Sequence, residues 1–352
     1  MIQNFSVIEQ ILSCYRDGVY LSIEANGGLV GEYFGKFEDR KGTRLLCQTR
    51  SIYFLIKMYE LFEDHHALNA ALKLYRETEA QYKIDDGWKA ARHYSVPTED
   101  LYELSFLSYA QLYLSRCSKE IDINNSAVAT LSKLLAIIER KNCYPEMIHY
   151  KGFISQNPLM HAFESFVAAT EILGDKSYLT AAAKILKIVE DNFFDSEAGL
   201  PFEVAVSDKN ATWYEPGHGF EWSTLLLMAA KEGLAIHGKM IPRQLIENAE
   251  QFGVVSNGLV VSRVFKDKFH KELAFRIWSQ LERVRALFAI GNRSTGNFAL
   301  DFVLSQFFTD KFLPSEYIGQ EVSELNVKTT TGYHIINCFE EVRRSSTKSQ
   351  SV

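Results

Sequence analysis

At 352 residues, of which 47% are hydrophobic, the chain is long enough to bury a large core in one or two domains. Acidic residues exceed basic ones by only 44 to 38, with both signs scattered, so no basic stripe points to nucleic acid as a partner. No apolar run approaches the roughly 20 residues of a membrane-spanning helix, and the N-terminus shows no signal-peptide pattern. We therefore expect a cytoplasmic protein with no membrane and no nucleic-acid partner.

The cysteines bear on the redox compartment. There are five, they lie far apart, and no Cys-x-x-Cys pair occurs: Cys14, Cys47, Cys117, Cys143 and Cys338. An odd number of dispersed cysteines predicts free thiols in a reducing compartment, rather than a disulfide framework or a zinc site.

Helical periodicity runs through most of the chain. After Pro158, for example, Met160, Phe163 and Val167 recur at steps of three and four residues, which places them on one helix face. Most prolines stand where such patterns begin or end. With ends uncertain by about 2–4 residues, the pattern predicts helices near residues 4–24, 47–63, 65–80, 98–117, 124–141, 158–173, 176–193, 217–237, 241–252, 270–291, 293–309 and 329–343.

Two segments break the helical pattern. They are residues 199–206 and residues 257–265, and in the second segment Asn257-Gly258 resembles the turn of a β-hairpin beside alternating valines. We expect short strands there, within loops. Strands and helices do not alternate regularly, so a doubly wound sheet is not expected and the predicted fold class is all-α.

No linker rich in Pro, Gly or Ser divides the chain. We therefore expect a single domain over residues 1–342, followed by a polar, frayed tail over residues 343–352. About twelve helices joined by short loops suit a toroid or a solenoid, but periodicity alone does not distinguish these from a large bundle.

Two helix starts carry the same His-x-x-Glu pattern. His161 and Glu164 follow Pro158, and His218 and Glu221 follow Pro216. Residues three apart share a helix face, so each histidine can contact its glutamate. Unpaired amides in the first turn favour a neutral imidazole, whereas the carboxylate favours the charged ring, so we expect a pKa near neutrality. Such a group suits general acid–base catalysis.

Other interpretations of these pairs stay open. Each pair can simply cap a helix or satisfy a buried ring. A histidine and a carboxylate three apart can also bind iron or manganese in helical bundles, but there the usual order is Glu-x-x-His. The zinc-protease pattern His-Glu-x-x-His is absent as well. We therefore expect no metal.

The segment Glu215-Pro216-Gly217-His218-Gly219-Phe220-Glu221-Trp222 resembles the PGHxxEW signature of the N-acylglucosamine 2-epimerase family, which includes mannose isomerases and cellobiose 2-epimerase. Four further segments resemble the family in the same order, at residues 48–50, 157–164, 276–282 and 331–334. The resemblance spans nearly the whole chain and implies an (α/α)6 barrel of six inner and six outer helices around a central active site.

The resemblance also implies roles for individual residues. It assigns proton transfer at a sugar carbon to His218 and His334, with Glu221 supporting His218. His161 would help to hold or open the sugar ring, and Arg50 would bind sugar hydroxyls. The residues that it places around the substrate are Arg50, Tyr102, His161, Glu164, Trp222, Trp278 and Glu282.

Three features depart from the family pattern. Leu159 stands where many members have another histidine, and Leu104 replaces a residue that is usually polar. The tryptophan and acidic residues that precede the last histidine in the family are hard to match in residues 312–319. These departures concern the part of the site that selects the sugar.

The resemblance implies an enzyme that needs no cofactor. A histidine would remove the proton beside the carbonyl of a ring-opened sugar, giving a cis-enediol. The ending at residues 331–334 and the modest length favour an isomerase that interconverts an aldose and a ketose, of the mannose and fructose type, free or phosphorylated. A sugar 2-epimerase acting on N-acylglucosamine or a related sugar stays open, as does a noncatalytic carbohydrate-binding barrel. The expected partner is a small-molecule sugar, and the family suggests a homodimer.

Overall fold

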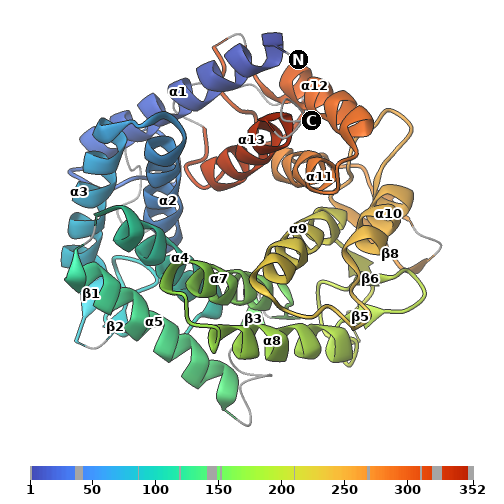
Figure 1. The fold of residues 1–352 in the computed structure, drawn as a ribbon, viewed down its shortest axis with the longest axis horizontal. Helices are drawn as coiled ribbons and strands as arrows, with labels where there is room; N and C mark the ends of the chain where they lie inside the picture. Colours follow the sequence, from blue (N-terminus) through green and yellow to red (C-terminus); the bar gives the residue numbers. More distant parts are fainter. Residues whose placement is uncertain are drawn as a thin grey trace. The chain divides into compact units, whose positions relative to one another are not determined.

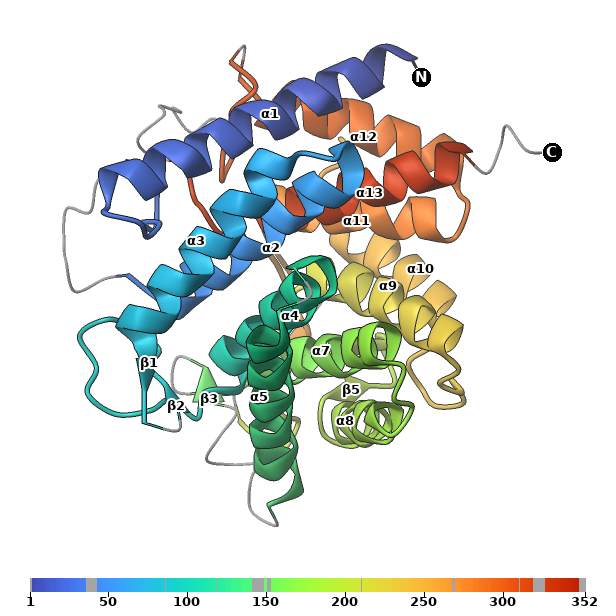
Figure 2. The same ribbon diagram turned by 60° about the vertical axis from the view of Figure 1, so that its left-hand side comes forward.

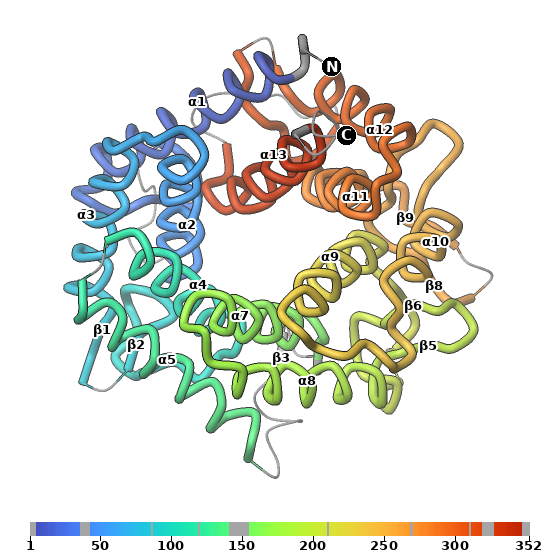
Figure 3. The backbone as a smooth tube through the Cα atoms, viewed as in Figure 1, coloured from blue at the N-terminus to red at the C-terminus, as the bar shows by residue number. Residues whose placement is uncertain are grey.

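The structure is a computed structural model that describes residues 2–35, 43–85, 87–118, 120–140, 149–150, 153–209, 211–267, 270–309, 311–318 and 327–347. These residues contain twelve helices, drawn as ribbons in Figure 1 and as a tube in Figure 3. Each predicted helix is present. They are α1 Ile2–Ala25, α2 Leu45–Phe62, α3 His65–Tyr82, α4 Leu101–Ser118, α5 Ile121–Glu139, α7 Asn157–Leu173, α8 Tyr178–Asn192, α9 Pro216–Glu232, α10 Pro242–Gly253, α11 Ile277–Ala289, α12 Arg293–Phe307 and α13 Gly332–Thr347.

Two predicted helices are shorter in the structure, each for a local reason. α9 ends at Glu232 because Gly233 adopts a left-handed conformation, with φ of 105°, and its amide bonds back to the last turn. Glycine reaches positive φ without the steric cost of a Cβ. α11 begins at Ile277, because Lys271–Glu272 is already paired as a strand. The predicted ends at residues 237 and 270 are therefore wrong.

The strands are short and, among the described residues, form small antiparallel sheets. Four of the five strand pairings join segments that are close in sequence, and the fifth adds a third strand to one of these sheets. The strands are β1 Lys83–Ile84 with β2 Gly87–Trp88, β3 His149–Tyr150 with β4 Phe153–Ile154, β5 Phe194–Asp195 with β6 Leu200–Pro201, and β7 Trp213–Tyr214 with β8 Arg263–Phe265 and β9 Lys271–Glu272. The strands predicted within residues 199–206 and 257–265 are present as β6 and β8.

The predicted hairpin turn is also present. Gly258 adopts a φ of 88°, which suits the residue after an asparagine in a tight turn. Val254 pairs with Val260 across the turn. This bridge closes the segment that leads into β8.

The chain divides into two compact units. The first comprises Met1–Ile137, Phe308–Glu316 and Gln320–Ile336, and the second comprises Ile138–Phe307, Tyr317–Gly319 and Asn337–Val352. Helix α13 contributes its first residues to one unit and the rest to the other. The single domain expected over residues 1–342 stays a prediction.

In the first unit, α2 packs against α3 and α4, and Figure 2 shows α2 and α3 side by side. The two helices bury their residues in different ways. α2 is buried continuously from Leu45 to Met58, whereas α3 buries a single stripe that includes Ala67, Ala71 and Leu74. A helix buried all round needs partners on several sides, and a striped helix covers one face of the core. α2 is therefore an interior helix and α3 covers it.

The second unit repeats this arrangement. α7 packs against α8 and α9, α9 also packs against α10 and α11, and α11 packs against α12. α7, α9 and α11 are buried over most of their length, whereas α8, α10 and α12 bury only one face. The His-x-x-Glu patterns and the segment with Glu282 all lie on the interior helices. Polar residues on such helices require partners within the protein.

α5 is an unusually apolar helix. Among the described helices it alone is long and apolar enough to cross a membrane by length and composition, with a mean hydropathy of 1.2. Its residues Ile123, Ala127, Leu131 and Leu134 are fully buried and follow steps of three and four. One buried stripe is the pattern of a helix that covers a protein core. The expected absence of a membrane partner stays a prediction.

The end of the chain differs from the predicted tail. α13 continues to Thr347, so the first residues of segment 343–352 are helical rather than frayed. The carbonyl of Ser345 accepts a hydrogen bond from Arg293, and Arg344 pairs with Glu341. These contacts extend the helix beyond the point where its apolar pattern stops. Residues 348–352 lie outside the described part of the chain.

The described cysteines are free thiols, as predicted. Cys14, Cys47, Cys117 and Cys338 form no disulfide. Cys143 lies outside the described residues.

Candidate active site

His218 stands in the first turn of α9, where two glycines allow close packing. The helix begins at Pro216, a position that needs no amide hydrogen. A Cβ on Gly217 would lie 2.6 Å from the ring of Trp278, and a Cβ on Gly219 would lie 2.9 Å from Leu200. The Pro-Gly-His-Gly run thus lets the helix start press against Trp278 and β6. The His218 and Trp278 rings lie 4.9 Å apart between centroids, inclined by 36°.

The partner of His218 is a residue that its local sequence does not reveal. Nδ1 of His218 lies 2.7 Å from Oε1 of Glu203, which stands two residues after β6. Both side chains are buried. Because a carboxylate accepts at this distance, the ring carries a hydrogen on Nδ1 and leaves Nε2 to exchange protons with another group.

Glu203 is itself held by a buried chain of hydrogen bonds. Nε2 of Gln156 donates to Oε1 of Glu203 at 3.2 Å, and Oε1 of Gln156 accepts from Nε1 of Trp222 at 2.7 Å. The backbone amide of Gln156 also donates to the carbonyl of Glu203. Gln156 and Trp222 are fully buried. The chain Trp222–Gln156–Glu203–His218 therefore fixes the direction of the imidazole.

The structure corrects the protonation state expected for His218. Burial lowers the pKa of His218, but the nearby carboxylates, led by Glu203, raise it to about 9. The field of a helix N-terminus is worth only about 0.3–1 kcal/mol per charge, and a carboxylate in direct contact outweighs it. The expectation of a pKa near neutrality is wrong for this residue. His218 holds a proton at neutral pH.

His161, on α7, makes the contact that its motif predicts. Its Nδ1 lies 3.0 Å from Oε2 of Glu164, three residues later on the same helix. Its Nε2 lies 4.0 Å from Oε1 of Glu221 on α9. The side chains of all three residues are at most 3% exposed. The ring of His161 thus stands between a carboxylate in contact and a second one that it does not touch.

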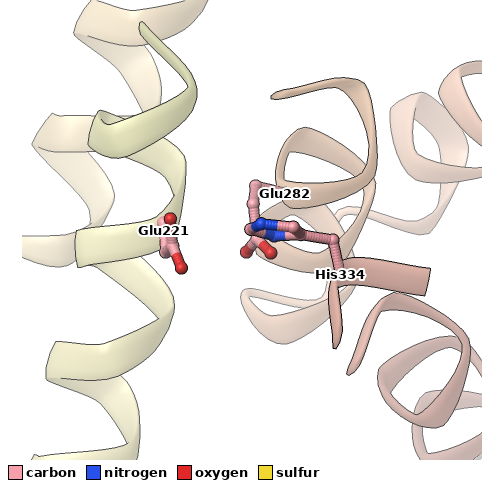
Figure 4. Close-up of side chains that lie close together, drawn as sticks. All are labelled: Glu221, Glu282 and His334. Carbon is pink, nitrogen blue, oxygen red and sulfur yellow. The ribbon is translucent and has the colours of Figure 1, made fainter. Parts of the chain in front are cut away.

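Glu221 faces a further carboxylate on α11. Figure 4 shows Glu221 on α9 and Glu282 on α11, and one carboxylate oxygen of each lies within 4.8 Å of the other. Glu282 forms an ion pair with Arg285 at 3.2 Å. Burial raises the pKa of Glu221 well above its ordinary range, and the charge of Glu282 raises it further. Figure 4 also draws His334, which belongs to the first unit.

In the first unit, the guanidinium of Arg50 is enclosed by aromatic rings. It donates to the hydroxyl of Tyr102 at 2.9 Å and to the carbonyl of Thr330 at 3.4 Å. It lies 4.2 Å from the ring centre of Phe106 and 5.0 Å from that of Tyr333. Among the described residues, no carboxylate forms an ion pair with Arg50. Rings on several faces hold the cation in one orientation.

His334 follows directly at the start of α13. Its ring packs edge-on against Tyr333, with centroids 4.8 Å apart. The helix starts at Gly332, whose amide donates to the hydroxyl of Tyr15 at 2.7 Å. A Cβ on Gly332 would lie 2.5 Å from the Tyr15 ring, so the Gly-Tyr-His run depends on this close approach. The side chain of His334 is buried.

The predicted site residues divide between the two units. Three lie in the first unit, Arg50, Tyr102 and His334, and seven lie in the second, His161, Glu164, His218, Glu221, Trp222, Trp278 and Glu282. The structure brings Arg50 together with Tyr102, His161 with Glu164 and Glu221, and His218 with Trp278. The pairing of His218 with His334 stays a prediction.

Three polar residues of the site were not predicted. Glu203 and Gln156 bond to predicted residues of α9, and Arg285 bonds to Glu282. Gln156 and Arg285 adjoin recognised segments, so their position next to a motif was an available signal. Glu203 stands in a loop with no motif, and only the folded chain reveals its role.

Comparisons with known proteins agree with the resemblance in the sequence. A model of the N-acylglucosamine 2-epimerase (GlcNAc 2-epimerase) family matches residues 32–307. A mannose-6-phosphate isomerase of Rhizobium meliloti (strain 1021) is 31% identical over 142 residues, which are 38% of this chain and 37% of that protein. The alignment thus spans little more than a third of that relative.

Two solved structures share the fold over almost all of this chain. A D-mannose isomerase aligns with a TM-score of 0.80 and 15% identity, covering 96% of this chain and 97% of the other. The cellobiose 2-epimerase from Spirochaeta thermophila aligns with a TM-score of 0.74 and 14% identity, covering 97% and 98%. At such identities the likeness concerns the fold alone. It confirms the predicted all-α, (α/α)6 fold class.

Proposed function

Because the chain belongs to the N-acylglucosamine 2-epimerase family, we propose that it is a sugar isomerase that interconverts an aldose and a ketose through a cis-enediol. The substrate class is a sugar of the mannose and fructose type, free or phosphorylated. The observation that carries the proposal is His218, a buried imidazole whose Nδ1 is held 2.7 Å from Glu203. Such a ring is prepared to move a proton at its other nitrogen.

The state of His218 supports a division of roles. With a pKa raised to about 9 by the surrounding carboxylates, it enters the reaction protonated. We assign it the part of the acid, which delivers the Nε2 proton to the carbonyl oxygen of the open-chain sugar. His334 is then the base that removes the proton from C2. His334 then gives its proton to C1 of the enediol, and His218 takes the proton of the C2 hydroxyl, so that the ketose forms and both histidines return to their first state.

The names of the relatives support the choice of reaction. One is a mannose-6-phosphate isomerase and one a D-mannose isomerase, and both names denote an exchange between an aldose and a ketose. A second candidate is 2-epimerisation, favoured by the description of the family and by the cellobiose 2-epimerase structure. Both reactions pass through proton removal at C2, and they differ in the carbon and the face that receive the proton.

Solvent exchange tests the proposal whichever product is formed. The full chain is incubated in D2O with mannose, fructose, glucose, their 6-phosphates and N-acetyl sugars, and deuterium at C1 and C2 is followed by NMR. We expect deuterium in an aldose and ketose pair, with both sugars appearing from either one. Deuterium at C2 with only an inverted aldose as product favours epimerisation. No incorporation into any sugar contradicts both reactions and favours a carbohydrate-binding protein.

The roles of the two histidines need a separate test. A crystal structure with an open-chain sugar analogue, such as a polyol, is expected to show both His218 and His334 in contact with the same molecule. Contacts from only one of them remove the other from the proposed pair.

A further inference from the structure

Glu221 is a buried carboxyl group whose charge is not neutralised by contact. The residue is 1% exposed, and its Oε1 has no hydrogen-bond partner among the described residues. An ionised carboxylate in this condition loses its hydration without receiving donors in exchange, which costs several kcal/mol. A buried acid avoids this cost by keeping its proton.

The nearest cations on α7, α9 and α11 do not contact Glu221. On α7, His161 is in contact with Glu164, and on α11, Arg285 is in contact with Glu282. On α9 itself, the protonated ring of His218 is in contact with Glu203. Arg285 and the ring of His218 are thus each bonded to another carboxylate, and the ring of His161 is bonded to Glu164. Glu282 and Glu164 add negative potential at Glu221, in agreement with its raised pKa.

We propose that Glu221 is a neutral carboxylic acid at neutral pH and that its O–H, together with Nε2 of His161, binds one hydroxyl group of the sugar. The identity of the ligand rests on the proposed function, whereas the protonation of Glu221 does not.

The distance between the two groups fits one bridging oxygen. Oε1 of Glu221 and Nε2 of His161 are 4.0 Å apart, too far for a direct hydrogen bond. An oxygen about 2.8 Å from each atom fits between them with an angle near 90°, within the range of hydroxyl hydrogen bonds. Because Nδ1 of His161 faces the Glu164 carboxylate, it carries the hydrogen, and Nε2 then accepts. A hydroxyl can therefore accept from Glu221 and donate to His161.

A hydroxyl is selected because it is both donor and acceptor. A carbonyl oxygen could accept from Glu221 but could not donate to His161, and an ammonium group could do only the reverse. If Glu221 were ionised, Glu221 and His161 would both be acceptors. A hydroxyl has a single hydrogen and could donate to only one of them. The neutral state of Glu221 is what makes the pair complementary to an alcohol.

Infrared spectroscopy tests the protonation directly. The full chain, without substrate at pH 7, is compared with Glu221→Gln in the region of the carboxylic C=O stretch. We expect this band to lose intensity in Glu221→Gln. The matched control is Glu164→Gln, the corresponding glutamate of the other motif. The band is expected to persist there, because the hydrogen bond from His161 favours the charged form of Glu164. A band that is unchanged in Glu221→Gln overturns the proposal.

Sugar binding tests the hydroxyl contact. Glutamine has the shape of a protonated glutamate and offers an N–H donor in place of the O–H, so Glu221→Gln is expected to keep kcat/KM within about 10-fold of the wild type. Glu221→Ala removes the donor from a desolvated site, and we expect its kcat/KM to fall by about 10²-fold or more. Equal, large losses in both variants show that the carboxylate form is needed and overturn the proposal. If no sugar undergoes exchange while the infrared result holds, the proposed function fails and the protonation of Glu221 stands.

Discussion

The starts of α7 and α9 carry nearly the same sequence pattern but differ in their contacts. In α7, His161 bonds to its own Glu164 one turn later. In α9, Nδ1 of His218 bonds instead to Glu203 from a distant loop, and Glu221 turns toward His161 and Glu282. The His-x-x-Glu motif therefore predicts the contact between its own histidine and glutamate only where no carboxylate from another segment bonds to the imidazole.

This difference separates the chemistry of the two histidines. Although burial lowers the pKa of His218, direct contact with Glu203 raises it and fixes the Nδ1 hydrogen. His161 and Glu164 form a pair confined to one helix. A proton-transfer role suits the histidine whose raised pKa is set by a carboxylate from another segment, and a binding role suits the other.

The largest expected effect on activity comes from removing the imidazole of His218, and removing that of His161 is the comparison. His218→Ala should lower kcat by about 10²–10⁴-fold, the range for a lost general acid or base. His161→Ala should cost only about 10-fold, the equivalent of one or two hydrogen bonds to the substrate. Steady-state kinetics with the sugar identified by exchange provide the measurement. Equal losses in the two variants would show that the helix starts have equivalent roles.

Glu203→Gln should change the pH dependence of kcat/KM, because Glu203 sets the pKa of His218. Without the carboxylate, burial dominates and lowers the pKa of His218 from about 9 toward or below its ordinary value near 6.5. The alkaline limb of kcat/KM then moves to lower pH, and turnover at pH 8 falls by about 10²-fold. Glu203→Asp should restore part of the activity.

Nitrogen NMR of the His218 ring follows this change without any substrate. We expect its titration midpoint near 9 in the wild type and in the control Glu164→Gln, and well below that in Glu203→Gln. An unshifted midpoint in Glu203→Gln removes Glu203 from its positioning role.

The two motif glutamates should respond oppositely in stability. The pKa of Glu221 is higher in the folded chain than its value near 4.3 in the unfolded chain. The folded state then binds more protons, so the wild type loses stability as pH rises above the unfolded pKa. Glu221→Gln lacks this slope, and its Tm should exceed that of the wild type by a margin that grows from pH 5 to pH 8. Each kcal/mol corresponds to about 2–4 °C.

Glu164→Gln is the control variant for this comparison of Tm values. It exchanges a carboxylate bonded to His161 for a neutral amide, so its Tm should lie below that of the wild type. A Tm of Glu221→Gln that falls in parallel with that of Glu164→Gln contradicts the assignment of different protonation states.

The smallest effect is expected at the far end of the hydrogen-bond chain. Trp222→Phe keeps the packing against Phe163 but removes the donor to Gln156. We expect a loss of about 0.5–1.5 kcal/mol in unfolding free energy, and a decrease in kcat of less than about 10-fold, since Glu203 keeps its direct contact with His218. Trp88→Phe, in the first unit, reports the effect of a tryptophan unrelated to the site. A loss in kcat as large as that of Glu203→Gln would show that the whole chain acts as one unit.

Much of the fold was readable from local patterns. Apolar steps of three and four located each helix of the described residues, and Asn257-Gly258 located a turn, because these features depend on residues that are close in sequence. The predicted helix ends were wrong where a contact with another segment outweighed the local sequence pattern. Lys271–Glu272 lies within the segment predicted as helical over residues 270–291 but pairs as a strand, and Ser345 extends α13 through a bond to distant Arg293.

By itself the sequence determined the helical content, the family and the identity of most candidate site residues, since each depends on spacing or on a short motif. Only the tertiary structure decided which partner each side chain meets. Glu203 reaches His218 across 15 residues of sequence, and Glu221 is left beside carboxylates of two other helices. Protonation follows from burial and from the nearest charges, and a spacing of three residues does not encode either of them.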